Sequence, residues 1–189
     1  MTAIRSFEPL DLFKFNLTNL DSLTETYDIG FYLSYIARWP SMFNVVEGQD
    51  GEIQAYLMGK TESSPEHYRH SEHWLPWHAH ITALTVAPQA RRQGLARLLT
   101  ENMERSGDEY NAWFVDLFVR KSNKLAIDMY SKMGYSVFRR VLAYYSDDPT
   151  GIAEEEDALD MRKPLSRDKK REHVRGSGQD FTVEPMDVW

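Results

Sequence analysis

The most informative hydrophobic pattern of the chain lies between residues 78 and 105. Polar and apolar positions alternate from His78 to Ala83, and a period of two continued to Val86 predicts a strand whose two faces have different surroundings. Pro88 lacks a backbone N–H and favours an extended conformation at Ala87, so the strand is expected to end there. Beyond it the period becomes helical, which predicts a helix that opens at about Arg92 or Gln93. The residues at helical spacing are Leu95, Leu98, Leu99 and Met103.

Shorter patterns on either side predict the rest of a sheet. Strands over residues 44–47 and 53–59 are joined at Gly48-Gln49-Asp50-Gly51, a sequence that indicates a hairpin turn. Further strands are expected over residues 112–119, 135–145 and 158–163. Between the first two of these, Asn123 is a candidate N-cap of a helix that ends at Gly134. The order of elements predicts a mixed α/β sheet flanked by helices.

Composition narrows the class of protein. The chain has 189 residues, of which 42% are apolar and 27% charged, a balance typical of one globular domain. The absence of cysteine excludes disulfides, thiolate metal sites and a cysteine nucleophile. A net charge of −7 argues against a general nucleic-acid binder, and no apolar run suits a membrane span or a signal peptide. We therefore expect a cytoplasmic protein with no direct nucleic-acid or membrane partner.

Histidines cluster between His67 and His78, in the stretch HYRHSEHWLPWH. Their spacing reproduces no standard zinc pattern, and the stretch lies between two predicted strands. We expect a surface loop there and no metal site.

Candidate chemistry gathers where the central strand passes into the helix. A helix N-terminus offers free N–H groups and the positive end of the helix dipole, while Gly94 allows close approach to the backbone. Arg91 and Arg92 add positive charge. These features suit a pyrophosphate, although an ordinary amphipathic helix with a solvated basic first turn fits the same residues. The chain has neither a Walker lysine motif nor G-x-G-x-x-G, which disfavours nucleotide hydrolysis and dinucleotide binding.

The hexapeptide Arg91-Arg92-Gln93-Gly94-Leu95-Ala96 matches the R/Q-x-x-G-x-G/A signature of the GCN5-related N-acetyltransferases (GNAT). Longer stretches resemble the catalytic subunits of NatB protein N-terminal acetyltransferases: LTETYDIGFYLSYIARWP, WHAHITALTVAP, FVDLFVRKSNKLAIDMYSKMGYSVFR and DALDMRKPLSRD. The resemblance implies the GNAT fold over residues 1–166, an α/β (α+β) fold with a mixed, mostly antiparallel central sheet flanked by helices. Residues 167–189 are rich in charge and poor in aliphatic side chains, so we expect a flexible C-terminal tail.

The resemblance implies acetyl-CoA as co-substrate, with its pyrophosphate on the motif loop and its pantetheine arm along the preceding strand. The implied cofactor-binding residues are Leu84, Thr85, Val86, Arg91, Arg92, Gln93, Gly94, Leu95, Ala96, Asn123 and Tyr130. Tyr130 and Asn123 are also the implied catalytic residues, because Tyr130 matches the family's tyrosine that faces the departing thiolate. From the residues alone, Tyr130 reads as a core tyrosine and Asn123 as a helix cap.

The implied substrate is the free α-amine of an N-terminus that begins Met-Asp, Met-Glu, Met-Asn or Met-Gln. Recognition of the side chain at the second position of this substrate requires polar groups of the enzyme. His80 and Thr82 lie two residues apart on one strand face, where both can donate to a carboxylate or accept from an amide. Further substrate-binding residues implied by the resemblance are Glu25, Tyr27, Tyr144 and Tyr145. The sequence does not decide which group acts as the general base: Glu25, His80, or one of the paired tyrosines, Tyr144 and Tyr145.

The resemblance also implies a large helical-repeat auxiliary subunit that docks on the first two helices and connects the enzyme to the ribosome. The aromatic residues of the second helical segment are expected in the core by default: Tyr27, Phe31, Tyr32, Tyr35 and Trp39. Two alternative functions stay open. One is a GNAT acetyltransferase that acts on other N-termini or on lysine, and the other is a catalytically dead acetyl-CoA-binding scaffold subunit.

Overall fold

The computed structural model describes residues 3–19, 24–71, 74–145 and 155–188 of the chain. These residues gather into two compact units. The N-terminal unit consists of Met1–Thr61 and His80–Tyr110, and the C-terminal unit of Glu62–Ala79 and Asn111–Trp189. Within the described ranges, no helix is both long and apolar enough to cross a membrane.

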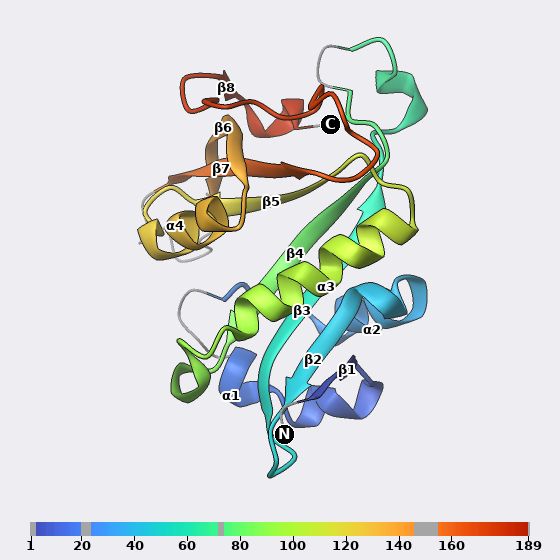
Figure 1. Cartoon of the computed structure of the whole chain (residues 1–189), viewed down its shortest axis with the longest axis vertical. Coiled ribbons are helices and arrows are strands. Elements are labelled where there is room, and N and C mark those ends of the chain that lie inside the picture. Colours follow the sequence, from blue (N-terminus) through green and yellow to red (C-terminus); the bar gives the residue numbers. More distant parts are fainter. Residues whose placement is uncertain (1–2, 20–23, 72–73, 146–154, 189) are drawn as a thin grey trace. The chain divides into compact units, whose positions relative to one another are not determined.

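The N-terminal unit combines strands β1 to β4 with helices α1 to α3 (Figure 1). Its elements are β1 (Ala3–Ser6), α1 (Asn16–Asn19), α2 (Ile29–Arg38), β2 (Phe43–Glu47), β3 (Ile53–Glu62), β4 (His78–Val86) and α3 (Leu95–Glu109), with 3-10 helices at Pro9–Phe13, Pro40–Met42 and Pro88–Ala90. The strands lie in the order β1-β2-β3-β4, and both β1 and β3 pair antiparallel with β2. The predicted hairpin of β2 and β3 is confirmed.

The core of the N-terminal unit is aromatic on the side covered by α2. Asp28 starts α2 by accepting a hydrogen bond from the Phe31 N–H over 3.0 Å. Tyr32 and Tyr35 are buried among side chains of β2 and β3, and the other predicted aromatics pack at the edge of this cluster. The core prediction is therefore confirmed for Tyr32 and Tyr35, whereas Tyr27, Phe31 and Trp39 are only half-buried. On β3, a Cβ at Gly59 would collide with Met103, so α3 lies close against this strand.

The C-terminal unit contains β5 (Phe114–Arg120), α4 (Lys124–Lys132), β6 (Ser136–Tyr145), β7 (Glu156–Pro164) and β8 (Thr182–Val183), with 3-10 helices at Glu66–Tyr68 and Pro185–Asp187. The strands lie in the order β5-β7-β6-β8. β7 pairs antiparallel with β5 and β6, whereas β8 pairs parallel with β6. The predicted strand with both faces buried corresponds to β5, and the predicted short partner strand corresponds to β7.

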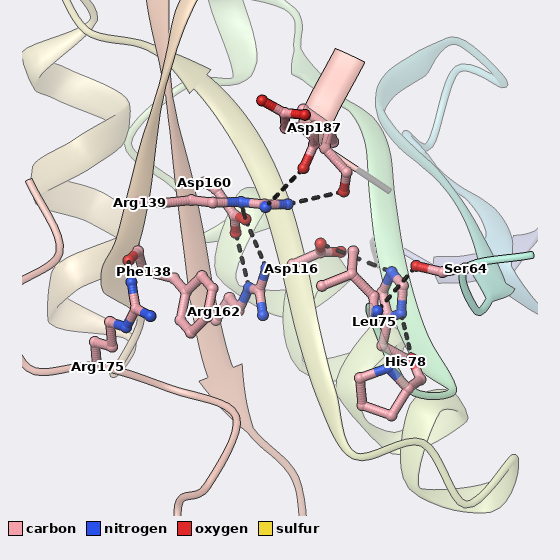
Figure 2. Close-up of polar contacts among 12 residues, drawn as sticks. Ser64, Leu75, His78, Asp116, Phe138, Arg139, Asp160, Arg162, Arg175 and Asp187 are labelled. Atoms are coloured by element: carbon pink, nitrogen blue, oxygen red, sulfur yellow. Dashed lines mark hydrogen bonds and ion pairs between the residues drawn. The ribbon is translucent and has the colours of Figure 1, made fainter. Parts of the chain in front are cut away.

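A buried ionic network lies between β6 and β7 (Figure 2). Asp160 is 0% exposed and accepts hydrogen bonds from Arg139 Nε over 2.9 Å and from Arg162 Nη2 over 2.7 Å. The Arg162 guanidinium also lies 3.5 Å from the ring centre of Phe138 and 4.6 Å from that of Phe114. Buried ions are tolerated only when partners surround them, so each charge of this network depends on the others.

The C-terminal tail differs from the sequence-based expectation of a flexible segment. β8 adds to β6, and the Arg140 N–H donates to the Phe181 carbonyl over 2.7 Å. Gly178 approaches β6 so closely that a Cβ there would collide with the Phe138 carbonyl. Arg139 donates to the Val188 carbonyl over 2.9 Å. The tail packs because its backbone hydrogen-bonds to the edge of β6, which a composition rule does not detect. The domain boundary at residue 166 stays a prediction.

Two histidines of the C-terminal unit make stability depend on pH. Burial lowers the pKa of His78 despite Asp116 Oδ2 at 3.8 Å and Glu62 Oε1 at 3.9 Å from its Nε2. Burial also lowers the pKa of His173. A folded pKa below the unfolded value of about 6.5 means that the unfolded chain binds more protons between the two values. Acidification through this window therefore favours unfolding.

We expect the free energy of unfolding, measured in urea, to be level above pH 7 and to fall below about pH 6.5. His78 alone contributes at most about 1.4 kcal/mol per pH unit. The variant His78→Gln should show a shallower fall between pH 6.5 and 5.5 than the parent chain. Equal slopes for the two proteins would contradict the assignment.

Candidate active site

The two residues predicted to recognise the substrate side chain, His80 and Thr82, lie on one face of β4. His80 and Thr82 are half-buried, whereas Ile81 and Thr85 on the opposite face are buried. This confirms the predicted strand with two different faces. The Thr82 hydroxyl lies 2.9 Å from the hydroxyl of Tyr35 on α2, a hydrogen bond that orients the Thr82 side chain.

The loop after β4 leads into α3 by way of two left-handed residues. Arg92 has a φ of 65° and Gly94 a φ of 82°, and α3 begins only at Leu95. The predicted start at Arg92 or Gln93 is therefore wrong, because a residue with positive φ cannot belong to a right-handed helix. A Cβ at Gly94 would meet no atom within 4 Å, so the backbone conformation, rather than space, is what favours glycine here.

The start of α3 is open to an anion. Among the described residues no side chain caps this end, and its first turn contains no acidic residue. The first N–H groups therefore keep their capacity to donate, and the helix dipole adds partial positive charge. Arg91 is exposed and its Nε donates to the Val86 carbonyl over 3.3 Å. Leu95 is 6% exposed, so its backbone rather than its side chain can face a ligand. The arrangement suits a phosphate group.

The predicted peptide-binding loop belongs to the same unit. Glu25 is exposed, and the Tyr27 N–H donates to the Tyr32 hydroxyl over 3.1 Å. One residue before Glu25, the Thr24 hydroxyl lies 2.9 Å from the hydroxyl of Thr85 on β4. The structure thus fixes the loop with Glu25 and Tyr27 to the strand that precedes the motif.

Asn123 and Tyr130 lie on α4 of the C-terminal unit. Asn123 is the N-cap, as its side chain accepts a hydrogen bond from the Ala126 N–H over 3.1 Å. Tyr130 is 6% exposed and meets Tyr135 edge to face, with 5.5 Å between ring centres. Burial raises the pKa of the Tyr130 hydroxyl, which therefore keeps its proton at neutral pH. A group in this state can donate a hydrogen bond or a proton.

The paired tyrosines lie at the end of β6, beyond a backbone irregularity. Ala143 has a φ of 46°, and the pairing of β6 with β7 shifts between Val141 and Tyr145. A regular strand would place neighbouring side chains on opposite faces. Here the rings of Tyr144 and Tyr145 meet edge to face, with 5.1 Å between their centres. Arg120 lies over the Tyr145 ring at 4.0 Å.

The predicted site residues therefore divide between the two units. The N-terminal unit holds the Glu25 and Tyr27 loop, β4 from His80 onward and the motif loop, and the C-terminal unit holds Asn123, Tyr130 and the paired tyrosines. Sequence reasoning missed Tyr35 and Thr24 as partners of strand residues. Helical periodicity marks Tyr35 only as a core position, and nothing in the local sequence distinguishes Thr24.

The histidine-rich stretch forms no metal centre within the part of the chain that the structure describes. His67 and His70 are exposed, in agreement with a surface loop, whereas His73 lies outside the described residues. His78 differs, because it is 1% exposed and its Nδ1 lies 2.7 Å from the Pro76 carbonyl.

Known proteins match this chain over most or all of its length. Residues 11–135 match the Acetyltransferase (GNAT) family. The N-terminal acetyltransferase B complex catalytic subunit naa20 of Schizosaccharomyces pombe is 51% identical over 190 aligned residues, which cover 100% of this chain and 99% of that protein. The crystal structure of Chaetomium thermophilum Naa20 in complex with a bisubstrate analogue has 56% identity and a TM-score of 0.92, and the match covers 99% of each chain.

A second solved structure, the NatB acetyltransferase complex bound to a bisubstrate inhibitor, shares 38% identity with a TM-score of 0.80, again over 99% of each chain. These matches confirm the GNAT fold, a mixed sheet flanked by helices. The chain belongs to the GNAT acetyltransferases and, within them, to the catalytic subunits of the NatB N-terminal acetyltransferases.

Proposed function

We propose that this chain transfers the acetyl group of acetyl-CoA to the α-amine of proteins that begin Met-Asp, Met-Glu, Met-Asn or Met-Gln. The observation that carries the proposal is its likeness, over the whole chain, to NatB catalytic subunits, one of them in complex with a bisubstrate analogue. The open start of α3 supports the same chemistry.

The residues around the start of α3 suit the pyrophosphate of acetyl-CoA. The first backbone N–H groups of α3 would donate to the phosphate oxygens, with Arg91 and Arg92 as counter-charges. Arg91, Arg92, Gln93 and Gly94 are exposed and accessible to a ligand. Backbone groups at Leu84, Thr85 and Val86 would bind the pantetheine arm. The motif loop and the end of β4 therefore form the cofactor side of the site.

The transfer needs little base strength. An α-amine has a pKa of about 7.7–8.0, so part of it is neutral at pH 7 and can attack the thioester carbonyl. The new C–N bond forms as the C–S bond breaks, the amine loses one proton, and the departing thiolate gains one. We assign to the Tyr130 hydroxyl, which burial keeps protonated, the role of hydrogen-bond or proton donor to the departing thiolate. The proton that the amine loses passes to the base, and a proton from solvent restores the Tyr130 hydroxyl if it has been given up. Asn123 is assigned to the cofactor beside its capping role, and the base stays open among Glu25, His80 and the paired tyrosines.

Recognition of the peptide is assigned to both units. Thr82 and His80 would read the acidic or amide side chain at the second substrate position, with Thr82 oriented by Tyr35. Glu25 and Tyr27 would hold the initiating methionine and its backbone. Tyr144 and Tyr145 would offer their hydroxyls to the peptide backbone.

An auxiliary subunit fits the exposed apolar surface of the first helices. Leu10 is 68% exposed, Phe13 80%, Ile29 66% and Leu33 41%. These side chains lie on the first 3-10 helix and on α2, the elements predicted to dock the partner. Burial of such side chains against a partner is favourable. Attachment to the ribosome through that subunit, and a cytoplasmic location, belong to the same proposal.

Acetylation of a peptide panel, with and without the co-expressed auxiliary subunit, tests this function. We expect turnover on Met-Asp, Met-Glu, Met-Asn and Met-Gln peptides to exceed turnover on Ser-, Ala- or Lys-bearing peptides, and to require the auxiliary subunit. Equal or better turnover on the second group would favour another amine specificity. Binding of acetyl-CoA without any turnover would favour the scaffold alternative. A fully active chain alone would contradict the docking proposal.

A further inference from the structure

Two sets of hydrogen-bonded polar side chains lie in the N-terminal unit, and we refer to both together, Thr24, Thr85, Tyr56, Asn19 and Tyr32, as the hydroxyl chain. In the first set, Thr24 Oγ1 lies 2.9 Å from Thr85 Oγ1. The second set is centred on Asn19. The Tyr56 hydroxyl donates to Asn19 Oδ1 over 2.7 Å, and the Tyr32 hydroxyl donates to the same oxygen over 3.3 Å.

Tyr56 and Tyr32 both donate to Asn19, because a side-chain amide oxygen can only accept. Between Thr24 and Thr85, either hydroxyl can be the donor. Tyr56 is 0% exposed, Tyr32 2% and Thr85 5%, so a broken link would leave a buried polar atom without compensation from water.

The hydroxyl chain holds both ends of the loop that carries Glu25. At one end Thr24 is bonded to Thr85 on β4, and at the other the Tyr27 N–H donates to the Tyr32 hydroxyl over 3.1 Å. Thr85 lies between Leu84 and Val86, whose backbone we assign to the cofactor. The bond between Thr24 and Thr85 therefore links the proposed peptide loop to the proposed cofactor strand.

We propose that the hydroxyl chain positions the Glu25 and Tyr27 loop for binding of the substrate N-terminus, with Tyr56 and Asn19 as positioning residues. This inference rests on the proposed function, because it takes Glu25 and Tyr27 to contact the peptide. A packed apolar core would not need these buried polar groups, whereas a loop that must present Glu25 in one place does. Loss of a link should thus weaken peptide binding while the chemical step proceeds as before.

The test uses the chain in complex with its auxiliary subunit and measures KM and kcat for a Met-Asp peptide and for acetyl-CoA. Thr24→Val and Tyr56→Phe each remove one hydroxyl and keep the shape of the side chain. We expect a peptide KM about 3- to 10-fold higher in each, the effect of one hydrogen bond, with kcat and the acetyl-CoA KM within about twofold.

Controls separate positioning from a general loss of stability. Thr24→Ser should restore the parent KM, because it restores the hydroxyl. Ser106→Ala removes a buried hydroxyl bonded to the Ser41 carbonyl near the end of α3 and should leave the peptide KM unchanged. An unchanged peptide KM in Thr24→Val and Tyr56→Phe, or equal changes for both substrates, would overturn the inference. The proposed function is tested separately. If the parent complex acetylates the peptide and Glu25→Ala raises the peptide KM, the proposed function holds even when the positioning inference fails.

Discussion

Replacement of Asp160 by asparagine is expected to lower the free energy of unfolding by about 3–5 kcal/mol. The carboxylate is 0% exposed and accepts from Arg139 and Arg162, both also buried. Asp160→Asn would leave two buried guanidinium groups without the carboxylate that both share, a larger penalty than the loss of one ordinary hydrogen bond. Urea denaturation followed by circular dichroism measures the effect.

An exposed ion pair provides the matched comparison. Glu66 Oε1 lies 2.7 Å from Arg69 Nη1, with both side chains more than half exposed. Glu66→Gln should change the free energy of unfolding by less than about 1 kcal/mol, because water screens such pairs. If Asp160→Asn cost no more than Glu66→Gln, the buried network would not stabilise the C-terminal unit as the structure indicates.

Replacement of Tyr130 by phenylalanine is expected to reduce kcat by about 10²- to 10⁴-fold, the range typical of a lost general acid. The ring keeps its packing against Tyr135, so the fold and the peptide KM should change little. Steady-state kinetics on a Met-Asp peptide, with acetyl-CoA saturating, measure the effect.

Tyr135 supplies the control for that experiment. It is 3% exposed, and its ring contacts the Tyr130 ring edge to face. Tyr135→Phe removes a phenolic hydroxyl from the same cluster and should leave kcat within about threefold, well short of the loss typical of a missing general acid. A normal kcat in Tyr130→Phe, or equal losses in the two variants, would remove Tyr130 from the chemical step.

Local signals were sufficient to predict β4, the hairpin of β2 and β3, and the helix cap at Asn123. Each depends on a few neighbouring residues: alternation, turn glycines, or an asparagine before a helix. The predicted end of this helix at Gly134 is also local, because Gly134 follows the residues at helical spacing. Its φ of 94° is typical of a glycine that ends a helix. The motif loop and the cofactor were predicted from resemblance, because arginine and glycine residues alone also fit an ordinary helix start.

What sequence reasoning missed depends on partners far apart in the chain. Asp160 and Arg162 look like solvated charges of a short strand, and only Arg139 and the rings of β5 and β6 show why they are buried. The tail resembles a disordered segment in composition, yet it packs on β6 through backbone hydrogen bonds. Thr24 and Tyr56 form hydrogen bonds to partners 61 and 37 positions away in the chain.

The most direct test of the proposed activity uses one peptide with two possible acceptors. A peptide that begins Met-Asp and carries an internal lysine is incubated with acetyl-CoA and the enzyme complex, and tandem mass spectrometry locates the acetyl group. We predict one acetyl group on the α-amine of the methionine and none on the lysine. Acetylation of the lysine side chain, or no acetylation at all, would contradict the proposed function.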